Sequence, residues 1–248
     1  MASKLFQSTL RGRTAAITGA SGGIGLAIAE RFLHEGSSVV LLGRDAQKLK
    51  VAASQLPHDD RIREHVLDVR LEQSWADAIP LFPDVDILIN CAGISQRSLL
   101  VRTSEDEIRD ILDTNLVGTI LGCRAVARHW LKSKRRREPL PDYCIINLSS
   151  LLGVRGCAGT SVYSASKAGI IGLTTSLAAE FRGTRVNAIL PGYIDTAMTN
   201  DADKPQKMKI PVARFGTPDE VADAAAFLAK NKYANNCILN LDGGLSAT

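Results

Sequence analysis

A tyrosine and a lysine, Tyr163 and Lys167, stand out because their neighbours in VYSASKAGIIGLTTSLAAEF are small or apolar. The stretch has a helical pattern, and residues four apart on a helix share one face, so the two side chains converge. A phenol has an ordinary pKa near 10, about three units above the range in which a general acid works at neutral pH. Shifting the pKa that far requires roughly 4 kcal/mol. A nearby ammonium favours the phenolate, so the spacing predicts proton transfer tuned by Lys167.

The rest of this helix is mostly alanine, glycine, isoleucine and leucine on every side. A helix without a polar face is buried all round. Because helices form the outer layer of a sandwich, we expect a partner subunit to cover this one, which makes the protein a homo-oligomer.

A glycine-rich turn provides a candidate site for a phosphate group. In TAAITGASGGIGLAIAERF, Gly19, Gly23 and Gly25 join an expected strand to an expected helix. Glycine lets the backbone turn sharply and approach a pyrophosphate, and the helix start offers unpaired N–H groups and a positive dipole end. The turn therefore predicts a dinucleotide site.

Seven short runs of β-branched or aliphatic residues, separated by helical segments, must position these residues. Strands that alternate with helices indicate a parallel sheet, and runs this continuously hydrophobic need helices on both faces. We expect a single α/β domain over residues 1–248, with a Rossmann-like, doubly wound parallel sheet. The expected strands are residues 14–18, 38–42, 63–67, 86–90, 144–149, 185–190 and 236–241.

Three segments lie outside this pattern. Residues 1–12 are expected to form an N-terminal arm, and residues 131–143 are irregular and basic. Residues 196–211 are polar, end in proline and follow a strand. Because open α/β sheets bind ligands at the carboxyl ends of their strands, residues 196–211 are a candidate substrate loop.

The composition narrows the class of protein. The 248 residues are 45% hydrophobic with a net charge of +4, and the basic residues are spread along the chain, so no nucleic-acid surface is expected. No run is long enough to cross a membrane. Five scattered cysteines indicate free thiols inside a cell. No metal site is expected, because His34, His58, His65 and His129 lack ligand spacing.

From about residue 13 to residue 245 the chain resembles the short-chain dehydrogenase/reductase family. The resemblance rests on motifs in the family's order and spacing, namely Thr18 to Gly25 (TGxxxGxG), Asp68-Val69, NCAG (90–93), Asn115 in DTNLVGT, NLSSLLG (147–153), Tyr163-x-x-x-Lys167 and Pro191-Gly192. It implies a nicotinamide cofactor and a subunit that pairs through the Tyr163 helix across a two-fold axis, in a dimer or tetramer.

Charge at the end of the second expected strand favours NADP(H) over NAD(H). Gly43 stands where an acid would contact the ribose of NAD, and Arg44 follows. A guanidinium holds a 2′-phosphate that a carboxylate would repel. Asp45 complicates this, and we favour a helix cap for it over a ribose contact. Gly22 departs from the basic residue of many NADP-binding relatives, which weakens the preference.

The resemblance implies the catalytic roles. Tyr163 would protonate the substrate carbonyl oxygen as hydride arrives from nicotinamide, and the positive oxidised ring would help to favour the phenolate. Lys167 would also hold the ribose hydroxyls, and Ser150 would hydrogen-bond the carbonyl, with Ser149 structural. Asn115 would shape its helix and hold water in a proton path to Lys167.

It also implies the cofactor contacts. Asp68 would hydrogen-bond the adenine, the NCAG backbone would line its ribose, and Thr196 would bind the carboxamide or the phosphates. The implied cofactor-binding residues are Thr18, Gly19, Ser21, Gly23, Ile24, Gly25, Gly43, Arg44, Asp68, Val69, Asn90, Ala92, Gly93, Tyr163, Lys167, Pro191, Gly192, Ile194 and Thr196.

Within the family, the phrases PGYIDTAMT, IPVARFGTPDEVADAAAFLA and DGGLSAT are similar to those of 3-oxoacyl-(acyl-carrier-protein) reductases. Acyl carrier proteins are acidic, so a basic rim could steer them, with Lys134–Arg137, Arg182 and Arg185 as candidates. For the Lys134–Arg137 run we favour a solvated loop.

Two alternatives remain open. The first is an NADP-dependent enzyme for a free ketone, steroid or sugar alcohol. The second is a non-catalytic, cofactor-sensing binding protein. The expected compartment is the cytoplasm. The mitochondrial matrix is the alternative, because the first thirteen residues are basic and contain no acid, as in an organelle-targeting peptide.

Overall fold

The computed structural model describes residues 9–57, 60–134, 142–199 and 209–248. Its centre is a seven-stranded sheet in the order β3-β2-β1-β4-β5-β6-β7, with every neighbouring pair parallel. The strands are β1 (Thr14–Thr18), β2 (Ser38–Gly43), β3 (Ile62–Val66), β4 (Ile87–Asn90), β5 (Tyr143–Leu148), β6 (Thr184–Pro191) and β7 (Ile238–Leu241). The expected Rossmann-like sheet is confirmed, and all seven strands lie within two residues of their predicted positions.

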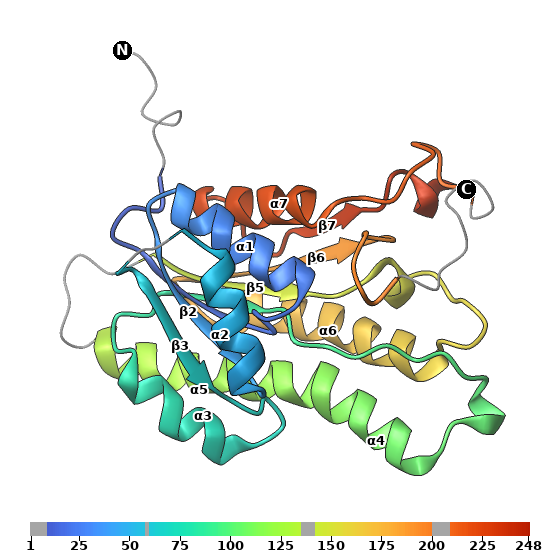
Figure 1. Cartoon of the computed structure of the whole chain (residues 1–248), viewed down its shortest axis with the longest axis horizontal. Helices are drawn as coiled ribbons and strands as arrows, with labels where there is room; N and C mark the ends of the chain where they lie inside the picture. Colours follow the sequence, from blue (N-terminus) through green and yellow to red (C-terminus); the bar gives the residue numbers. More distant parts are fainter. Residues whose placement is uncertain (1–8, 58–59, 135–141, 200–208) are drawn as a thin grey trace.

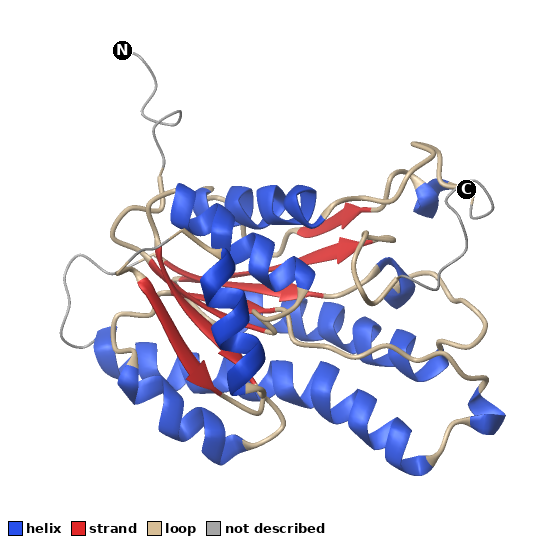
Figure 2. Cartoon of the chain, in the orientation of Figure 1, coloured by secondary structure: helices blue, strands red, loops and turns tan. Residues whose placement is uncertain are grey.

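Helices cover both faces of the sheet (Figures 1 and 2). The α-helices are α1 (Gly23–His34), α2 (Ala46–Gln55), α3 (Glu72–Ala78), α4 (Glu105–Leu112), α5 (Gly118–Lys134), α6 (Ser161–Glu180) and α7 (Pro218–Lys230). The short 3-10 helices are η2 (Ile79–Leu81), η3 (Leu100–Arg102), η5 (Leu151–Gly153) and η6 (Leu245–Ala247). No helix among the described residues is long and apolar enough to span a bilayer.

The strands carry apolar residues on both faces because the protein has a core on each side of the sheet. Ala15 and Ile17 of β1 belong to the core beneath α1 and α7, whereas Ala16 between them belongs to the core beneath α3, α5 and α6. Side chains alternate between the faces of a strand, so a strand buried on both faces becomes a continuous hydrophobic run. Leu10 of the expected N-terminal arm is only 1% exposed, so the arm enters the first core at this residue.

The strand order reverses at β1, and this reversal locates the site. From β1 the chain moves outward to β2 and β3 and then returns to place β4 on the other side of β1. The loops that leave β1 and β4 therefore diverge and open a crevice at the carboxyl ends of the strands. The Thr18 hydroxyl accepts hydrogen bonds from the backbone N–H groups of Cys91 and Ala92, at 3.0 and 3.1 Å, which fixes the two loops relative to each other.

A π-helical turn, η4 (Asp113–Val117), joins α4 to α5 without a break. A π turn inserts one extra residue into a helix and is frequent at functional sites. Here it carries Asn115, which is fully buried and faces α6.

Helix α6 buries one side in the subunit and leaves the other side exposed in the single chain. Ile170, Thr174 and Leu177 face the interior, but a row of small residues is exposed in the single chain. A Cβ added at Gly172 would meet nothing within 4 Å. The inner side is buried as predicted, and the exposed side is the one that a partner subunit was expected to cover. The exposed small residues are Ala165, Ala168, Gly172, Thr175, Ser176 and Ala179.

Candidate active site

Two adjoining cavities occupy the carboxyl ends of the strands. One, of about 390 Å³, surrounds the glycine turn, and the other, of about 450 Å³, lies in front of α6. They share five lining residues, so they form one continuous cleft. The shared residues are Ile24, Cys91, Gly93, Thr196 and Met198.

The glycine turn brings backbone into close contact with backbone. Gly19 has a φ of +65°, and a Cβ there would lie 2.9 Å from the Ala92 backbone. A Cβ at Gly25 would lie 2.4 Å from the carbonyl oxygen of Gly19. Neither contact is possible for a real side chain, so only glycine permits this approach of α1 to the strand end.

The start of α1 is open to an anion. Its N-cap is Gly22, which offers no side-chain cap, and its first turn contains no acidic residue. The first N–H groups of α1 thus meet the cleft together with the positive end of the helix dipole. Thr196 lies across from this turn, since a Cβ on Gly23 would come within 3.1 Å of its methyl group.

Cationic side chains line the cleft beyond β2. Arg44 lies there as predicted, and Lys48, one helical turn further along α2, lines the same cavity. Sequence reasoning missed Lys48, although its place four residues after Arg44 could have indicated it. Asp45 caps α2, accepting from the N–H groups of Gln47 and Lys48 at 2.9 and 3.1 Å, so the predicted cap is confirmed.

Three of the expected cofactor residues do not line the cleft. Thr18 is buried and holds the β4 loop as described above. Asn90 points into the core, where its amide donates to the Asn147 oxygen at 2.9 Å. The Asp68 carboxylate is paired with Arg70 at 2.8 Å, and this pairing lowers the Asp68 pKa despite partial burial.

The other expected cofactor residues all line one or both cavities. In the cavity around the glycine turn these are Gly19, Ser21, Gly23, Ile24, Gly25, Gly43, Arg44, Val69, Ala92, Gly93 and Thr196. In the cavity before α6 they are Ile24, Gly93, Tyr163, Lys167, Pro191, Gly192, Ile194 and Thr196.

A buried hydroxyl in the cleft needs an external partner. Thr114 is 5% exposed and lines the cavity with Leu67 and Val69, yet among the described residues its Oγ1 has no hydrogen-bond partner. An unpaired buried polar group is costly unless a ligand satisfies it. Together with the glycine turn, the open start of α1 and the two cations, this orphaned hydroxyl fits a dinucleotide with a polar base edge and phosphate groups.

Tyr163 and Lys167 lie on one face of α6 and converge as predicted. The Lys167 Nζ lies 5.7 Å from the centroid of the Tyr163 ring and donates to the Leu148 carbonyl at 2.8 Å. Burial lowers the pKa of Lys167 to about 8. The ammonium thus sits beside the phenol in a poorly solvated pocket.

The groups of this chain alone shift the Tyr163 pKa upward, whereas the expected lowering also involved the positive ring of the oxidised cofactor. Burial raises the phenol pKa, a hydrogen bond with Ser150 opposes the rise, and Lys167 is not among the groups that shift it. The phenolate loses more hydration on burial than the hydrogen bond with Ser150 returns. The groups of this chain alone therefore do not turn Tyr163 into a neutral-pH acid.

The two serines after β5 divide their tasks. Ser150 lines the cavity and caps η5, with its hydroxyl accepting from the Leu152 N–H at 3.1 Å. Ser149 is buried, and its hydroxyl donates to the Lys167 carbonyl at 2.7 Å, which anchors the middle of α6. Asn115 lies near Lys167, because a Cβ on Gly93 would come within 3.2 Å of the Asn115 oxygen and 3.4 Å of Lys167 Nζ. Asn115 itself lines neither cavity.

The cavity before α6 is mainly apolar. Its apolar lining includes Leu151, Leu152, Tyr193 and Met198, and its cations among the described residues are Arg97 and Lys167. Of the expected substrate loop, Thr196, Met198 and Thr199 line this cavity, and residues 200–208 lie outside the described part of the chain. Arg97 donates to the Met198 carbonyl at 2.6 Å and links the loop after β4 to the substrate loop.

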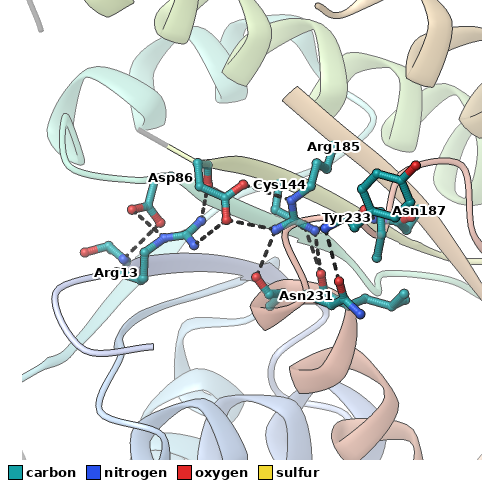
Figure 3. A network of polar contacts seen from close by, with 12 residues as sticks. Arg13, Asp86, Cys144, Arg185, Asn187, Asn231 and Tyr233 are labelled. Atoms are coloured by element: carbon teal, nitrogen blue, oxygen red, sulfur yellow. Dashed lines mark hydrogen bonds and ion pairs between the residues drawn. The ribbon is translucent and has the colours of Figure 1, made fainter. Parts of the chain in front are cut away.

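Arg185 is not part of a basic rim, and the proposal that it steers a partner is wrong. It is 7% exposed, and its guanidinium pairs with Asp142 at 2.8 Å and donates to three carbonyls at the end of α7 and just beyond (Figure 3). Arg182 is exposed but lies at the amino end of β6, at the opposite edge of the sheet from the cleft. The side chains of the Lys134–Arg137 run lie outside the described residues.

No metal centre emerges from the described residues, which exclude His58. They contain no group of three His, Cys, Asp or Glu residues able to hold a metal ion. The five cysteines are free thiols, and burial raises the pKa of Cys91 to about 12, which makes it inert.

Comparison with known proteins assigns this fold and site to a class. The sequence model of the short chain dehydrogenases matches residues 13–207, and the chain belongs to this family of oxidoreductases. A 3-oxoacyl-(acyl-carrier-protein) reductase of Chlamydia muridarum is 37% identical over 255 residues, covering 96% of this chain and 99% of that protein.

Two further relatives show the breadth of the family. Carbonyl reductase family member 4 of Danio rerio is 38% identical and covers 94% of this chain and 98% of its own length. The crystal structure of a 3-ketoacyl-(acyl-carrier-protein) reductase from Brucella melitensis complexed with NADH is 28% identical, with a TM-score of 0.88, and covers 96% of this chain and 100% of that chain.

Proposed function

We propose that the protein reduces a carbonyl to a hydroxyl with NADPH, and that its substrate is a 3-oxoacyl thioester carried by acyl carrier protein. The observation that carries this proposal is the convergence of Ser150, Tyr163 and Lys167 on a mainly apolar cavity that adjoins the glycine-turn cleft. A ketone flanked by an alkyl chain needs this combination of proton donor, oxyanion partner and apolar wall.

Each residue has a definite task in this reaction. Bound NADPH supplies the hydride, and its oxidised ring supplies positive charge near the phenol. Tyr163 donates its phenolic proton to the carbonyl oxygen, and the Ser150 hydroxyl donates a hydrogen bond to the same oxygen. Lys167 holds the ribose hydroxyls, and with its pKa near 8 it passes a proton toward Tyr163 after turnover.

Charge supports NADPH as the reductant. Arg44 and Lys48 line the far end of the cleft, and the carboxylate of Asp45 is engaged by two N–H groups of α2. A 2′-phosphate therefore meets two cations on this segment, together with one carboxylate whose Oδ1 already accepts two hydrogen bonds. The NADH-bound relative from Brucella melitensis makes the comparison of both nucleotides a necessary test.

The test is turnover of the purified protein with NADPH on two matched series. One series presents 3-oxoacyl chains of several lengths on acyl carrier protein, and the other presents the same chains as simple thioesters. We expect the highest kcat/KM with carrier-bound substrates. Equal rates on both series would remove the carrier protein from the proposal, and inactivity on both would remove the thioester.

A second candidate is the reduction of free ketones. The carbonyl reductase of Danio rerio supports it, since it is as similar to this chain as the acyl-carrier-protein enzyme is. Free ketones, steroids and sugars added to the same assay separate the two activities. Tight NADPH binding with no oxidation by any carbonyl would instead favour a cofactor-sensing binding protein.

We also propose that each subunit is a single domain and that subunits pair in a dimer or tetramer through the exposed small residues of α6. Small residues let two helices approach closely, and the face lies along a helix of twenty residues. Free thiols on all five cysteines support an intracellular location, cytoplasmic or in the mitochondrial matrix. Sedimentation of the purified chain tests the oligomer.

A further inference from the structure

The helix that carries Tyr163 is capped by a side chain from a distant loop. Its own N-cap residue, Thr160, provides no side-chain cap. Instead, the Gln96 Oε1 accepts hydrogen bonds from the N–H groups of Val162 and of Tyr163 itself, at 2.7 and 3.1 Å. Gln96 thus satisfies two of the donors that a helix start leaves unpaired.

The amide of Gln96 is held in a fixed orientation. The side chain is 3% exposed, and its Nε2 donates to the Ser98 carbonyl and to the Thr103 hydroxyl, both at 3.1 Å. The Thr103 hydroxyl also contacts the Ser98 hydroxyl at 2.9 Å. With both ends of its amide engaged, Gln96 is a rigid strut between the loop after β4 and the start of α6.

The carbonyl of Tyr163 is held from the opposite side. The Ser166 hydroxyl donates to this carbonyl at 2.6 Å and accepts from the Asn115 amide at 3.1 Å. Asn115 also exchanges hydrogen bonds with the N–H and carbonyl of Ile94, at 2.8 and 3.0 Å. The same loop therefore reaches the Tyr163 backbone by two routes, one through Gln96 and one through Asn115.

We propose that Gln96 is a positioning residue for the reaction: by holding the Tyr163 N–H it sets the distance from the phenol to Ser150 and to the substrate carbonyl. This inference rests on the proposed reductase function. A misplacement of about 1 Å in such a group costs up to 10²-fold in rate. Gln96 borders the substrate cavity, but both ends of its amide are engaged by protein groups, so we expect its effect on kcat rather than on KM.

The test compares two substitutions at this position. Gln96→Met keeps the length and the burial of the side chain but offers no acceptor, and we expect kcat to fall about 10-fold with the KM for NADPH within two-fold of the starting value. Gln96→Glu keeps both accepted hydrogen bonds, loses the donor to the Ser98 carbonyl and adds a negative charge at the start of α6. We expect it to retain more of the rate and to move the pH profile of kcat upward, because that charge raises the pKa of Tyr163.

The matched control is Ser104→Ala on α4. The Ser104 hydroxyl caps α4 by accepting from the Glu107 N–H at 3.2 Å, so its loss removes a helix cap while the Thr103 hydroxyl that holds Gln96 stays in place. We expect a lowered Tm with unchanged kcat. If Gln96→Met and Ser104→Ala lower kcat equally, or if Gln96→Glu leaves the pH profile in place, the inference is overturned.

Hydrogen exchange separates this inference from the proposed function. In Gln96→Met the amides of Val162 and Tyr163 should exchange at least 10-fold faster than in the unmodified protein, while Ser104→Ala should leave them unchanged. An unmodified protein that reduces no carbonyl contradicts the function alone. Unchanged exchange at these amides contradicts the strut, whatever the activity.

Discussion

The amino ends and the carboxyl ends of the parallel strands, here called the amino edge and the carboxyl edge of the sheet, both bury charge. The buried charges differ in how far they are paired. At the amino edge, Arg13 and Arg185 converge on Asp86 and Asp142, and the donors of Arg185 end on a carboxylate or on a backbone carbonyl (Figure 3). At the carboxyl edge, Lys167 is 5% exposed, and its only recorded acceptor among the described residues is one carbonyl.

This difference separates structure from function. A saturated network has no capacity for a ligand and serves the fold, whereas an under-satisfied buried cation is costly and persists where a ligand completes it. Thr114 follows the same logic, since its buried hydroxyl lacks a partner at the carboxyl edge. Substitutions at the amino edge should therefore change stability, and substitutions at the carboxyl edge should change activity.

The largest effect is expected for Arg185→Met. This change leaves Asp142 with one cation and removes a donor from each of three carbonyls, so we expect a loss of about 3–5 kcal/mol in the free energy of unfolding. Urea denaturation measures the loss, and kcat per folded molecule should remain unchanged. Arg109→Met, which breaks an exposed pair with Glu105, is the control, with an expected loss below about 1 kcal/mol. A similar small loss at Arg185 would erase the contrast between the edges.

Next in size is Tyr163→Phe. Removal of the phenolic hydroxyl should lower kcat by at least 10²-fold and leave the Kd for NADPH and the Tm nearly unchanged. Steady-state kinetics and nucleotide titration measure the two quantities. Tyr233→Phe removes a hydroxyl from a side chain that is 98% exposed and should have no effect. A Tyr163→Phe protein that retained full activity would disprove the assignment of the proton donor.

The amino edge should show a pH dependence of its own. Burial, opposed by Arg13, raises the Asp86 pKa from its ordinary value of 3.8 to about 6. Between these pH values the folded state binds more protons at Asp86 than the unfolded state does, so the contribution of this group is present below pH 4 and lost as pH rises through 6.

Asp86→Asn removes this titration, so the difference between the two proteins reports on Asp86 alone. Carboxyls with lowered pKa values, such as Glu35 and Asp242, stay in both proteins, and their contribution to stability changes with pH in the opposite direction. As the pH rises from 4 to 7, the stability of Asp86→Asn should increase by about 1–3 kcal/mol relative to that of the unmodified protein. Denaturation curves at several pH values measure the gain. Parallel stability profiles for the two proteins would contradict the raised pKa.

The smallest effect is expected for Arg44→Ala at the far end of the cleft. Loss of one charge-assisted contact should raise the KM for NADPH roughly ten-fold and leave that for NADH almost unchanged. Steady-state kinetics with both nucleotides measures the ratio. An equal rise for the two nucleotides would mean that the 2′-phosphate is bound elsewhere, and Lys48→Ala would then be the next variant to measure.

Local patterns account for what the sequence predicted well. The strands are continuous apolar runs because each lies between two cores, and Gly19 and Gly25 are recognisable because no other residue fits their backbone contacts. Tyr163 and Lys167 are joined by helical geometry alone. Each of these predictions needed only residues close together in the chain.

Contacts between distant segments account for what was missed. Arg185 has the composition of a surface residue, and its burial depends on Asp142, 43 residues earlier, and on carbonyls near residues 228–234. Gln96 is an ordinary loop glutamine until the fold brings it to α6, 66 residues away. The charge that neighbours Tyr163 is visible in the sequence, whereas the depth of burial that raises its pKa within this chain is not.

The π turn at Asp113–Val117 makes this stretch unusually sensitive to changes in length. One residue added to or deleted from a helix rotates everything beyond it by about 100°. Such a change here would turn the buried side of α5 toward water while α4 kept its orientation. Insertions and deletions during evolution should therefore be excluded from residues 113–117 and tolerated in the surface connections.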